Sequence, residues 1–433
     1  MLEDRKSDQD EKPVVWLINH YGGRKGTVRS ERTWRIAEGL AKGGFRCILI
    51  SASHHHIRSE EIANNEVETL VSEPDGYEFF AVSTRAYVGN GLDRMRNMHD
   101  FYRGLKRIFL GTVLPTPDLV IASSPHPFAF LFANWARKRA GMAIVLEERD
   151  IWPRSLVELT GTPAWHPVVL LFDWMARRGY RGCDAIVSLL PNSEAFLRER
   201  GLRGEFFCIP NGVGESEENS ENETIPEDVC AWLESADAEG KLAVVYAGAM
   251  GPPNALEQLL ELASVDAGEE KPYRILCFGD GVSRQELASA AKEKASGFLT
   301  VRGPVSRSIA KRVIERADLC FISLRPSPIF ELGVSPNKLF EYMAAGKPVV
   351  FLVNSSNNPV AESDGGVSVE PYAAKELDVA LRRLAYMSEQ ERAEMGEKGK
   401  AYVEENHHWD QLGEKYVSVA RTVIKAHGER VKS

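Results

Sequence analysis

The chain has 433 residues, which is more than a single hydrophobic core usually organises, so we expect two domains. Its formal net charge of −9 at pH 7 gives no broad electrostatic attraction for nucleic acid, and we expect no nucleic-acid partner. No apolar run approaches the roughly 18 residues that a membrane-spanning helix needs, and residues 1–12 lack the apolar centre of a signal peptide. These features predict a cytoplasmic protein.

The first half of the chain, from Pro13, alternates apolar strands with helices. Strands are predicted at residues 14–19, 46–51, 119–123, 143–147 and 185–189, and helices at residues 29–42, 128–139 and 168–178. Near-continuous apolar strands separated by helices are typical of a parallel sheet that helices cover on both faces. We therefore predict a doubly wound α/β domain over residues 13–214.

An acidic, polar stretch at residues 215–228 contains few apolar side chains, and we place a linker region at residues 215–240. A second alternating series follows. Its strands are predicted at residues 243–247, 274–278, 298–301, 319–323 and 349–353, and its helices at residues 255–263, 284–295, 306–316 and 335–346. This series predicts a second doubly wound α/β domain at residues 241–405, followed by a C-terminal helix at residues 406–433.

The cysteine and histidine patterns give no indication of a metal site. The six cysteines are scattered without the CxxC spacing of zinc or redox motifs, and we expect buried free thiols. His54, His55 and His56 are consecutive, and neighbouring residues of an extended segment point to alternating faces, so they do not converge on one ion. We expect no metal ion.

One predicted helix start is suited to bind a phosphate. Ser335 is a residue type that caps helices, Pro336 fits a first turn, and Gly346 is a suitable end. Such a start directs free N–H groups and a partial positive charge at an anion. Lys338 and Glu341 share a face near it, and an ammonium neutralises phosphate while a carboxylate accepts hydrogen bonds from a ribose. An exposed ion pair between these two residues is the alternative.

Residues 335–350, SPNKLFEYMAAGKPVV, resemble the donor-site signature of GT4 retaining glycosyltransferases, in particular of bacterial enzymes that assemble capsule, O-antigen and lipopolysaccharide. The resemblance implies the GT-B fold, in which two Rossmann-like domains face each other across a cleft. It implies a UDP- or GDP-sugar as donor, a glycan or lipid-linked acceptor, no cofactor, and retention of the anomeric configuration. It also implies that residues 410–426 form a last helix that returns to the first domain.

The resemblance further implies which residues bind the nucleotide sugar. Glycine turns after strands let the main chain approach a diphosphate, while Lys338 holds phosphate and Glu341 holds ribose. The candidate donor-binding residues are Gly26, Thr27, Gly248, Gly251, Gly279, Arg302, Gly333, Val334, Ser335, Pro336, Asn337, Lys338 and Glu341. Many family members carry a glutamate at the position of Gly333, and we expect the main-chain amides of residues 333–335 to take its place.

The candidate catalytic residues are His126, Arg149 and Asp150, because ligands of open parallel sheets bind at the carboxyl ends of strands. Arg149 stands where many family members have a histidine before the aspartate. We expect Asp150 to accept a hydrogen bond from the incoming hydroxyl, and Arg149 to pair with a phosphate or with Glu148. A buried arginine–carboxylate pair that only fixes the loop is the alternative.

Residues 94–110 mix cations with apolar side chains at helical spacing. This pattern is suited to peripheral contact with an anionic membrane, such as the inner face of the cell membrane. Packing of the apolar side on the sheet is the alternative.

Two other functions remain open, namely a nucleotide-sugar 2-epimerase-like GT-B enzyme and a non-catalytic sugar-nucleotide-binding protein. An NAD-dependent Rossmann enzyme is poorly supported, since no GxGxxG follows a strand.

Overall fold

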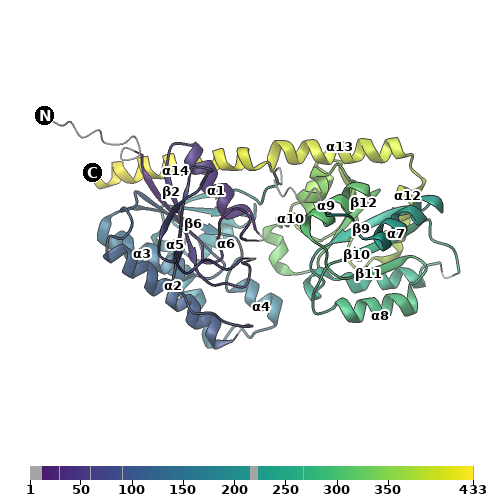
Figure 1. The fold of residues 1–433 in the computed structure, drawn as a ribbon, viewed down its shortest axis with the longest axis horizontal. Helices are drawn as coiled ribbons and strands as arrows, with labels where there is room; N and C mark the ends of the chain where they lie inside the picture. Colours follow the sequence, from purple (N-terminus) through teal and green to yellow (C-terminus); the bar gives the residue numbers. More distant parts are fainter. Residues whose placement is uncertain are drawn as a thin grey trace. The chain divides into compact units, whose positions relative to one another are not determined.

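The structure is a computed structural model that describes residues 12–28, 30–58, 60–89, 91–214, 223–266 and 268–432. The chain forms two compact units, each with its own sheet and helices (Figure 1). Unit 1 comprises Met1–Asn211 and Trp409–Ser433, and unit 2 comprises Gly212–His408. The last helix of the chain therefore belongs to the same unit as the first strand.

Unit 1 is built on an eight-stranded sheet in the order β3-β4-β2-β1-β5-β6-β7-β8. β3 pairs antiparallel with β4, and the other strands pair in parallel. The strands are β1 (Val14–Ile18), β2 (Arg46–Ala52), β3 (Leu70–Ser72), β4 (Glu78–Val82), β5 (Leu119–Ser123), β6 (Ala143–Glu148), β7 (Ala185–Ser188) and β8 (Glu205–Cys208). The helices are α1 (Arg32–Lys42), α2 (Leu92–Leu110), α3 (Phe128–Ala140), α4 (Arg154–Thr160), α5 (Pro167–Gly182), α6 (Glu194–Glu199) and α14 (Trp409–Lys432).

Alternation along β1 divides the core of unit 1 into two layers. Val15 and Leu17 belong to the cluster that contains the buried residues of α1 and α14. Trp16 instead stacks on Phe132 of α3 and meets Phe109 of α2 edge-on. Because successive side chains of a strand point to opposite faces, α1 and α14 cover one face of the sheet and α2 and α3 cover the other (Figure 1).

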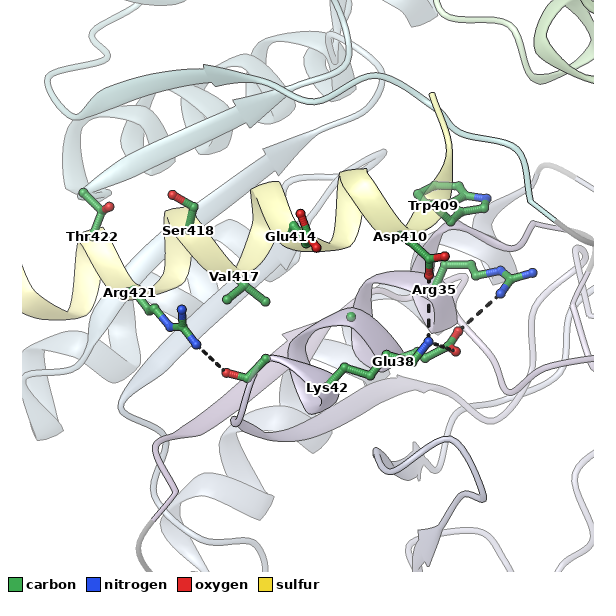
Figure 2. A pocket seen from close by; sticks show the side chains of 12 residues that line it. Arg35, Glu38, Lys42, Trp409, Asp410, Glu414, Val417, Ser418, Arg421 and Thr422 are labelled. Atoms are coloured by element: carbon green, nitrogen blue, oxygen red, sulfur yellow. Dashed lines mark hydrogen bonds and ion pairs between the residues drawn. The ribbon is translucent and has the colours of Figure 1, made fainter. Parts of the chain in front are cut away.

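α14 packs closely on α1. A Cβ atom on Gly39 would lie 2.8 Å from the Cα atom of Gly413, so the two backbones meet at a pair of glycines. Figure 2 shows the hollow of about 790 Å³ that opens between the two helices beside this crossing. In it, Lys42 pairs with Glu38 at 2.8 Å and with Asp410 at 3.8 Å. Its walls come from α1, α14 and the residue that ends α1, so it is a groove between helices and not a site at strand ends.

Unit 2 is built on a six-stranded parallel sheet in the order β11-β10-β9-β12-β13-β14. The strands are β9 (Leu242–Ala247), β10 (Tyr273–Phe278), β11 (Leu299–Arg302), β12 (Leu319–Ser323), β13 (Val349–Leu352) and β14 (Gly366–Ser368). The α-helices are α7 (Glu227–Ala238), α8 (Arg284–Lys294), α9 (Arg307–Arg316), α10 (Asn337–Ala344), α11 (Pro359–Glu362), α12 (Ala374–Tyr386) and α13 (Glu389–Asn406), and the 3₁₀ helices are η1 (Pro252–Asn254), η2 (Leu256–Ser264) and η3 (Pro328–Leu332).

Both sheets have the strand order of a doubly wound fold, which reverses between β1 and β5 and between β9 and β12. The prediction of an α/β protein with two doubly wound parallel-sheet domains is confirmed. None of the helices within the described ranges combines the length and the hydropathy that a membrane crossing requires.

The structure differs from the prediction at two places. Residues 227–238, predicted as part of the linker, form α7, because Val229, Trp232 and Leu233 are buried in the core of unit 2. The helix predicted at residues 255–263 is a 3₁₀ helix, η2, which runs over Leu256–Ser264. Residues 215–222 of the predicted linker lie outside the described residues.

Candidate functional site

The candidate residues gather at the carboxyl ends of the central strands of each unit. A doubly wound sheet leaves a crevice at the point where the strand order reverses, because the connections there run to opposite faces. In unit 2, residues 248–251 follow β9, and the segment after β12 leads to α10. In unit 1, residues 19–27 follow β1, and residues 124–127 follow β5.

Two glycine turns and one lysine come together in unit 2. Gly248 has a φ of 147° and Gly279 a φ of 150°, which residues with a side chain rarely adopt. A Cβ atom on Gly279 would overlap the carbonyl oxygen of Gly248, and a Cβ atom on Gly248 would lie 2.6 Å from Cε of Lys338. The two glycines therefore allow both turns and the lysine side chain to occupy one small volume.

Lys338 holds its ammonium group among neutral partners. Its Nζ donates to the Tyr246 hydroxyl at 2.6 Å and to Oδ1 of Asn254 at 3.2 Å. Burial lowers the pKa of Lys338 to about 8, although the nearby Glu341 carboxylate raises it in part. The ammonium therefore lacks a full countercharge that a bound diphosphate would supply.

The start of α10 differs from the predicted one. The helix begins at Asn337, Pro336 occupies the N-cap position with an extended ψ of 126°, and no side chain caps the helix. Ser335 is therefore not the cap, because helical dihedrals begin only after Pro336. The first N–H groups of a helix have no intrahelical acceptor, so those of Asn337 and Lys338 remain suited to an anion.

The main chain at Gly333 and Val334 is already hydrogen-bonded. Gly333, with a φ of 107°, donates to the carbonyl of Phe330 at 3.0 Å. The Val334 N–H donates to Oδ1 of Asn357 at 2.8 Å, and the Asn357 amide donates to the Val334 carbonyl at 3.0 Å. Two of the three amides expected to replace the family's glutamate are thus satisfied within the protein.

Glu341 and Arg302 each have a protein partner. Glu341 accepts a hydrogen bond from Arg307 of α9 at 3.0 Å, and both side chains are exposed. The sequence allowed an exposed ion pair between Lys338 and Glu341, but the exposed partner of Glu341 is Arg307. Arg302, at the end of β11, pairs with Asp228 of α7. Gly251 has a φ of −120° and room for a Cβ atom, so this position does not require glycine.

The segment between β1 and α1 in unit 1 contacts one candidate catalytic residue, Arg149, through Ser30. Gly26 is exposed, with a φ of 77°, and the Thr27 hydroxyl donates to the Arg24 carbonyl at 3.0 Å. Further along the chain, Ser30 accepts a hydrogen bond from Nη2 of Arg149 at 3.4 Å. The contact to the loop after β6 is therefore made by a residue that we did not predict.

Arg149 and Asp150 follow β6 on a loop that Ser124 fixes. The Ser124 hydroxyl accepts hydrogen bonds from the main-chain N–H groups of Arg149 and Asp150, at 2.8 and 3.3 Å. The Asp150 residue is exposed, and Arg149 is half-buried. Arg149 is not the partner of Glu148, which is buried and accepts a hydrogen bond from the Tyr180 hydroxyl at 2.6 Å. Burial raises the pKa of Glu148 to about 8.

His126 lies beneath the surface beside a second imidazole, His20, which follows β1. The two residues are 1 % and 2 % exposed, and their ring centroids are 4.6 Å apart. Burial lowers the pKa of His126 to about 3, and burial and the neighbouring His126 lower the pKa of His20 well below its ordinary value. Both rings are therefore neutral at pH 7, and His126 is not positioned to contact a substrate directly.

Sequence reasoning missed a buried ion pair between Arg32 of α1 and Glu147 of β6. Arg32 donates to Glu147 at 2.8 Å, to the Tyr416 hydroxyl at 2.8 Å, and to the carbonyls of Ile209 and Pro210 at 2.9 and 2.6 Å. Burial raises the pKa of Glu147, but the charges of Arg32 and Arg149 and the hydrogen bonds from Ser123 and Tyr416 together outweigh it and hold the pKa below its ordinary value. The buried arginine–carboxylate ion pair of this region is thus Arg32–Glu147, while the Arg149 guanidinium donates to Ser30 and acts on Glu147 only through its charge.

Residues 94–110 form most of α2, and the sheet covers their apolar side. Met98, Phe101 and Leu105 are buried, and two exposed cations have partners, Asp93 for Arg96 at 2.8 Å and Glu68 for Arg107. The packing alternative is the correct one for this helix, because its apolar stripe is used in the core of unit 1.

Two family models match the chain. Residues 30–212 match a glycosyl transferase 4-like domain, and residues 241–386 match glycosyl transferases group 1. The matched ranges cover the sheet of unit 1 from α1 onward and the sheet of unit 2. A search of curated proteins found no match.

Solved structures resemble the whole chain at low identity. Sucrose-phosphate synthase from Thermosynechococcus elongatus is 16 % identical, with a TM-score of 0.66 over 96 % of this chain and 100 % of that chain. The α,α-trehalose 6-phosphate synthase from Burkholderia multivorans is 12 % identical, with a TM-score of 0.67 over 98 % and 99 %. HepE from Anabaena, solved with UDP-glucose, is 12 % identical, with a TM-score of 0.61 over 94 % and 99 %. The chain is a glycosyltransferase and belongs to the GT4-like enzymes with the GT-B fold.

Proposed function

We propose that this enzyme transfers a sugar from a UDP- or GDP-sugar to a glycan or lipid-linked acceptor in surface-polysaccharide biosynthesis, with retention of configuration and without a metal ion. The observation that carries the donor class is the Lys338 ammonium, which lies against the Gly248 turn without a carboxylate hydrogen-bonded to it. The structure of HepE with UDP-glucose supports the same donor class.

The leaving diphosphate is stabilised in this proposal by groups of unit 2 that are already in place. Lys338 and the first N–H groups of α10 stabilise the negative charge that develops on the diphosphate as the bond between the anomeric carbon and the phosphate oxygen breaks. The acceptor oxygen bonds to the anomeric carbon on the same face, and its proton passes to the leaving phosphate. Asp150 accepts a hydrogen bond from the acceptor hydroxyl, and Arg149 pairs with a phosphate oxygen.

Glu341 holds the ribose in this proposal and exchanges its partner to do so. Its present partner, Arg307, forms an exposed ion pair with it. Such pairs contribute about 0–1 kcal/mol, so two hydrogen bonds from ribose hydroxyls replace the pair at little cost.

Thermal unfolding with UDP, GDP and their sugars tests the donor site. The right donor raises the melting temperature in proportion to its affinity and concentration. Glu341→Ala should lower that affinity by orders of magnitude, whereas Arg307→Ala, which removes the same ion pair from the other side, should retain it. A Glu341→Ala variant with the parent's affinity and activity would remove Glu341 from the site.

Measurement of nucleoside diphosphate release tests the reaction. Release that requires a glycan or lipid-linked acceptor is the expected result. Release without acceptor, together with an epimerised sugar, would instead assign the 2-epimerase-like activity. Donor binding with neither transfer nor slow hydrolysis would show a non-catalytic binding protein.

A further inference from the structure

The outward side of α5 in unit 1 carries an exposed apolar stripe. Leu170, Leu171 and Trp174 are 56 %, 42 % and 57 % exposed, and Trp165, just before the helix, is 74 % exposed. Positions three and four residues apart share one side of a helix. Two leucines and a tryptophan on one exposed side of the helix, with a second exposed tryptophan just before it, mark a contact surface, whereas single exposed apolar residues do not.

The same side of α5 becomes basic toward its C-terminal end. Arg178 and Arg181 are exposed and continue the stripe at helical spacing. Arg181 also lines a hollow of about 870 Å³, together with Lys138 and Arg203. Lys138, Arg181 and Arg203 form no ion pair with any residue that the structure describes. This concentration of cations stands out on a chain whose net charge is −9, and it attracts an anionic surface.

The buried side of α5 touches the loop that carries Asp150. Phe172 packs on Trp152, with ring centroids 5.6 Å apart, and Val168 packs against the same cluster. Trp152 follows Asp150 by two residues. A surface that rests on the exposed side of α5 is therefore separated from the candidate catalytic loop by a single helix.

We propose that Trp165, Leu170, Leu171, Trp174, Arg178 and Arg181 form a docking face with which the enzyme binds an anionic lipid bilayer. Tryptophan and leucine side chains enter the boundary between headgroups and acyl chains, while arginines lie among lipid phosphates. This inference rests on the proposed lipid-linked acceptor, because docking through α5 holds Asp150 close to the membrane surface where such an acceptor is anchored.

Co-sedimentation with vesicles tests the docking face. The full chain, without donor or acceptor, is mixed with vesicles of phosphatidylglycerol and phosphatidylcholine and with vesicles of phosphatidylcholine alone. We expect binding to the anionic vesicles that weakens with salt. The triple variant Leu170→Gln, Leu171→Gln, Trp174→Gln and the double variant Arg178→Gln, Arg181→Gln should each bind about tenfold more weakly or worse.

A matched control comes from unit 2. Val379→Gln with Tyr386→Gln removes two exposed apolar side chains from another helix, α12, and should leave vesicle binding unchanged. Absence of vesicle binding by the parent, or equal binding by parent and both α5 variants, would overturn the proposal. A parent that elutes as a dimer, with a monomeric triple variant and no vesicle binding, would assign the face to a second copy of the chain. Donor binding, measured separately by thermal shift, distinguishes these results from failure of the proposed function.

Discussion

Replacement of Lys338 with methionine is expected to stabilise the free protein while it abolishes donor binding. The pKa of Lys338 falls from 10.5 to about 8 in the folded chain, which corresponds to a cost of about 3 kcal/mol for keeping the proton there at neutral pH. Methionine has a similar length and no charge. Loss of the hydrogen bonds to Tyr246 and Asn254 costs about 1–2 kcal/mol and so offsets part of the stability gained by removing the buried charge. We therefore expect a net gain of roughly 1–2 kcal/mol, or a few degrees in Tm.

The pH dependence gives a second readout of the same group. Because the folded pKa of Lys338 lies below the unfolded one, the unfolded chain binds the extra proton between about pH 8 and pH 10.5, and the parent's stability rises with pH in that window. The Lys338→Met variant should lack this rise of stability with pH. A bound diphosphate raises the pKa again, so the Kd of UDP or GDP for the parent should increase about tenfold from pH 7 to pH 9.

Urea denaturation followed by tryptophan fluorescence, together with calorimetric titration of UDP and GDP, measures both effects. Lys292→Met, at an exposed lysine of α8, is the control and should change neither the free energy of unfolding nor the Kd. A Lys338→Met variant that is less stable than the parent, or that binds nucleotide with the parent's Kd, would refute the reasoning.

Two further predictions concern packing and buried charge. Gly279→Ala should lower the free energy of unfolding by about 3 kcal/mol or more, since its φ of 150° and the Gly248 carbonyl leave no room for a Cβ atom, whereas Gly251→Ala should cost under about 1 kcal/mol. Equal urea midpoints for these variants would contradict the close approach of the two turns. Glu147→Gln should cost about 3–5 kcal/mol because it leaves Arg32 buried without its carboxylate, and Glu78→Gln, which loosens the more exposed pair with Arg46, should cost at most about 1 kcal/mol. Since the folded pKa of Glu147 is lowered, this stability is present above the ordinary carboxyl pKa and is lost as pH falls through the folded value, so acid titration of unfolding should separate Glu147→Gln from the parent.

Local side-chain periodicity is enough to predict most of the fold. The strands Leu119–Ser123 and Leu319–Ser323 have the predicted ends, because apolar runs bounded by turns are visible in the sequence itself. α7 is missed for the opposite reason. Its residues look like an acidic linker until Trp232 is buried against a sheet that other segments build.

The sequence by itself determines that two doubly wound sheets form, that glycine turns follow β9 and β10, and that a helix with Lys338 and Glu341 begins after β12. These are local signals of spacing, backbone conformation and side-chain type. Only the tertiary structure decides the partners, which are Tyr246 and Asn254 for Lys338, and Arg307 for Glu341. It also buries His126 and leaves Leu170, Leu171 and Trp174 of α5 exposed. The physical reason is that strand order and helix packing bring together residues distant in the chain, and no pattern within a single segment encodes those contacts.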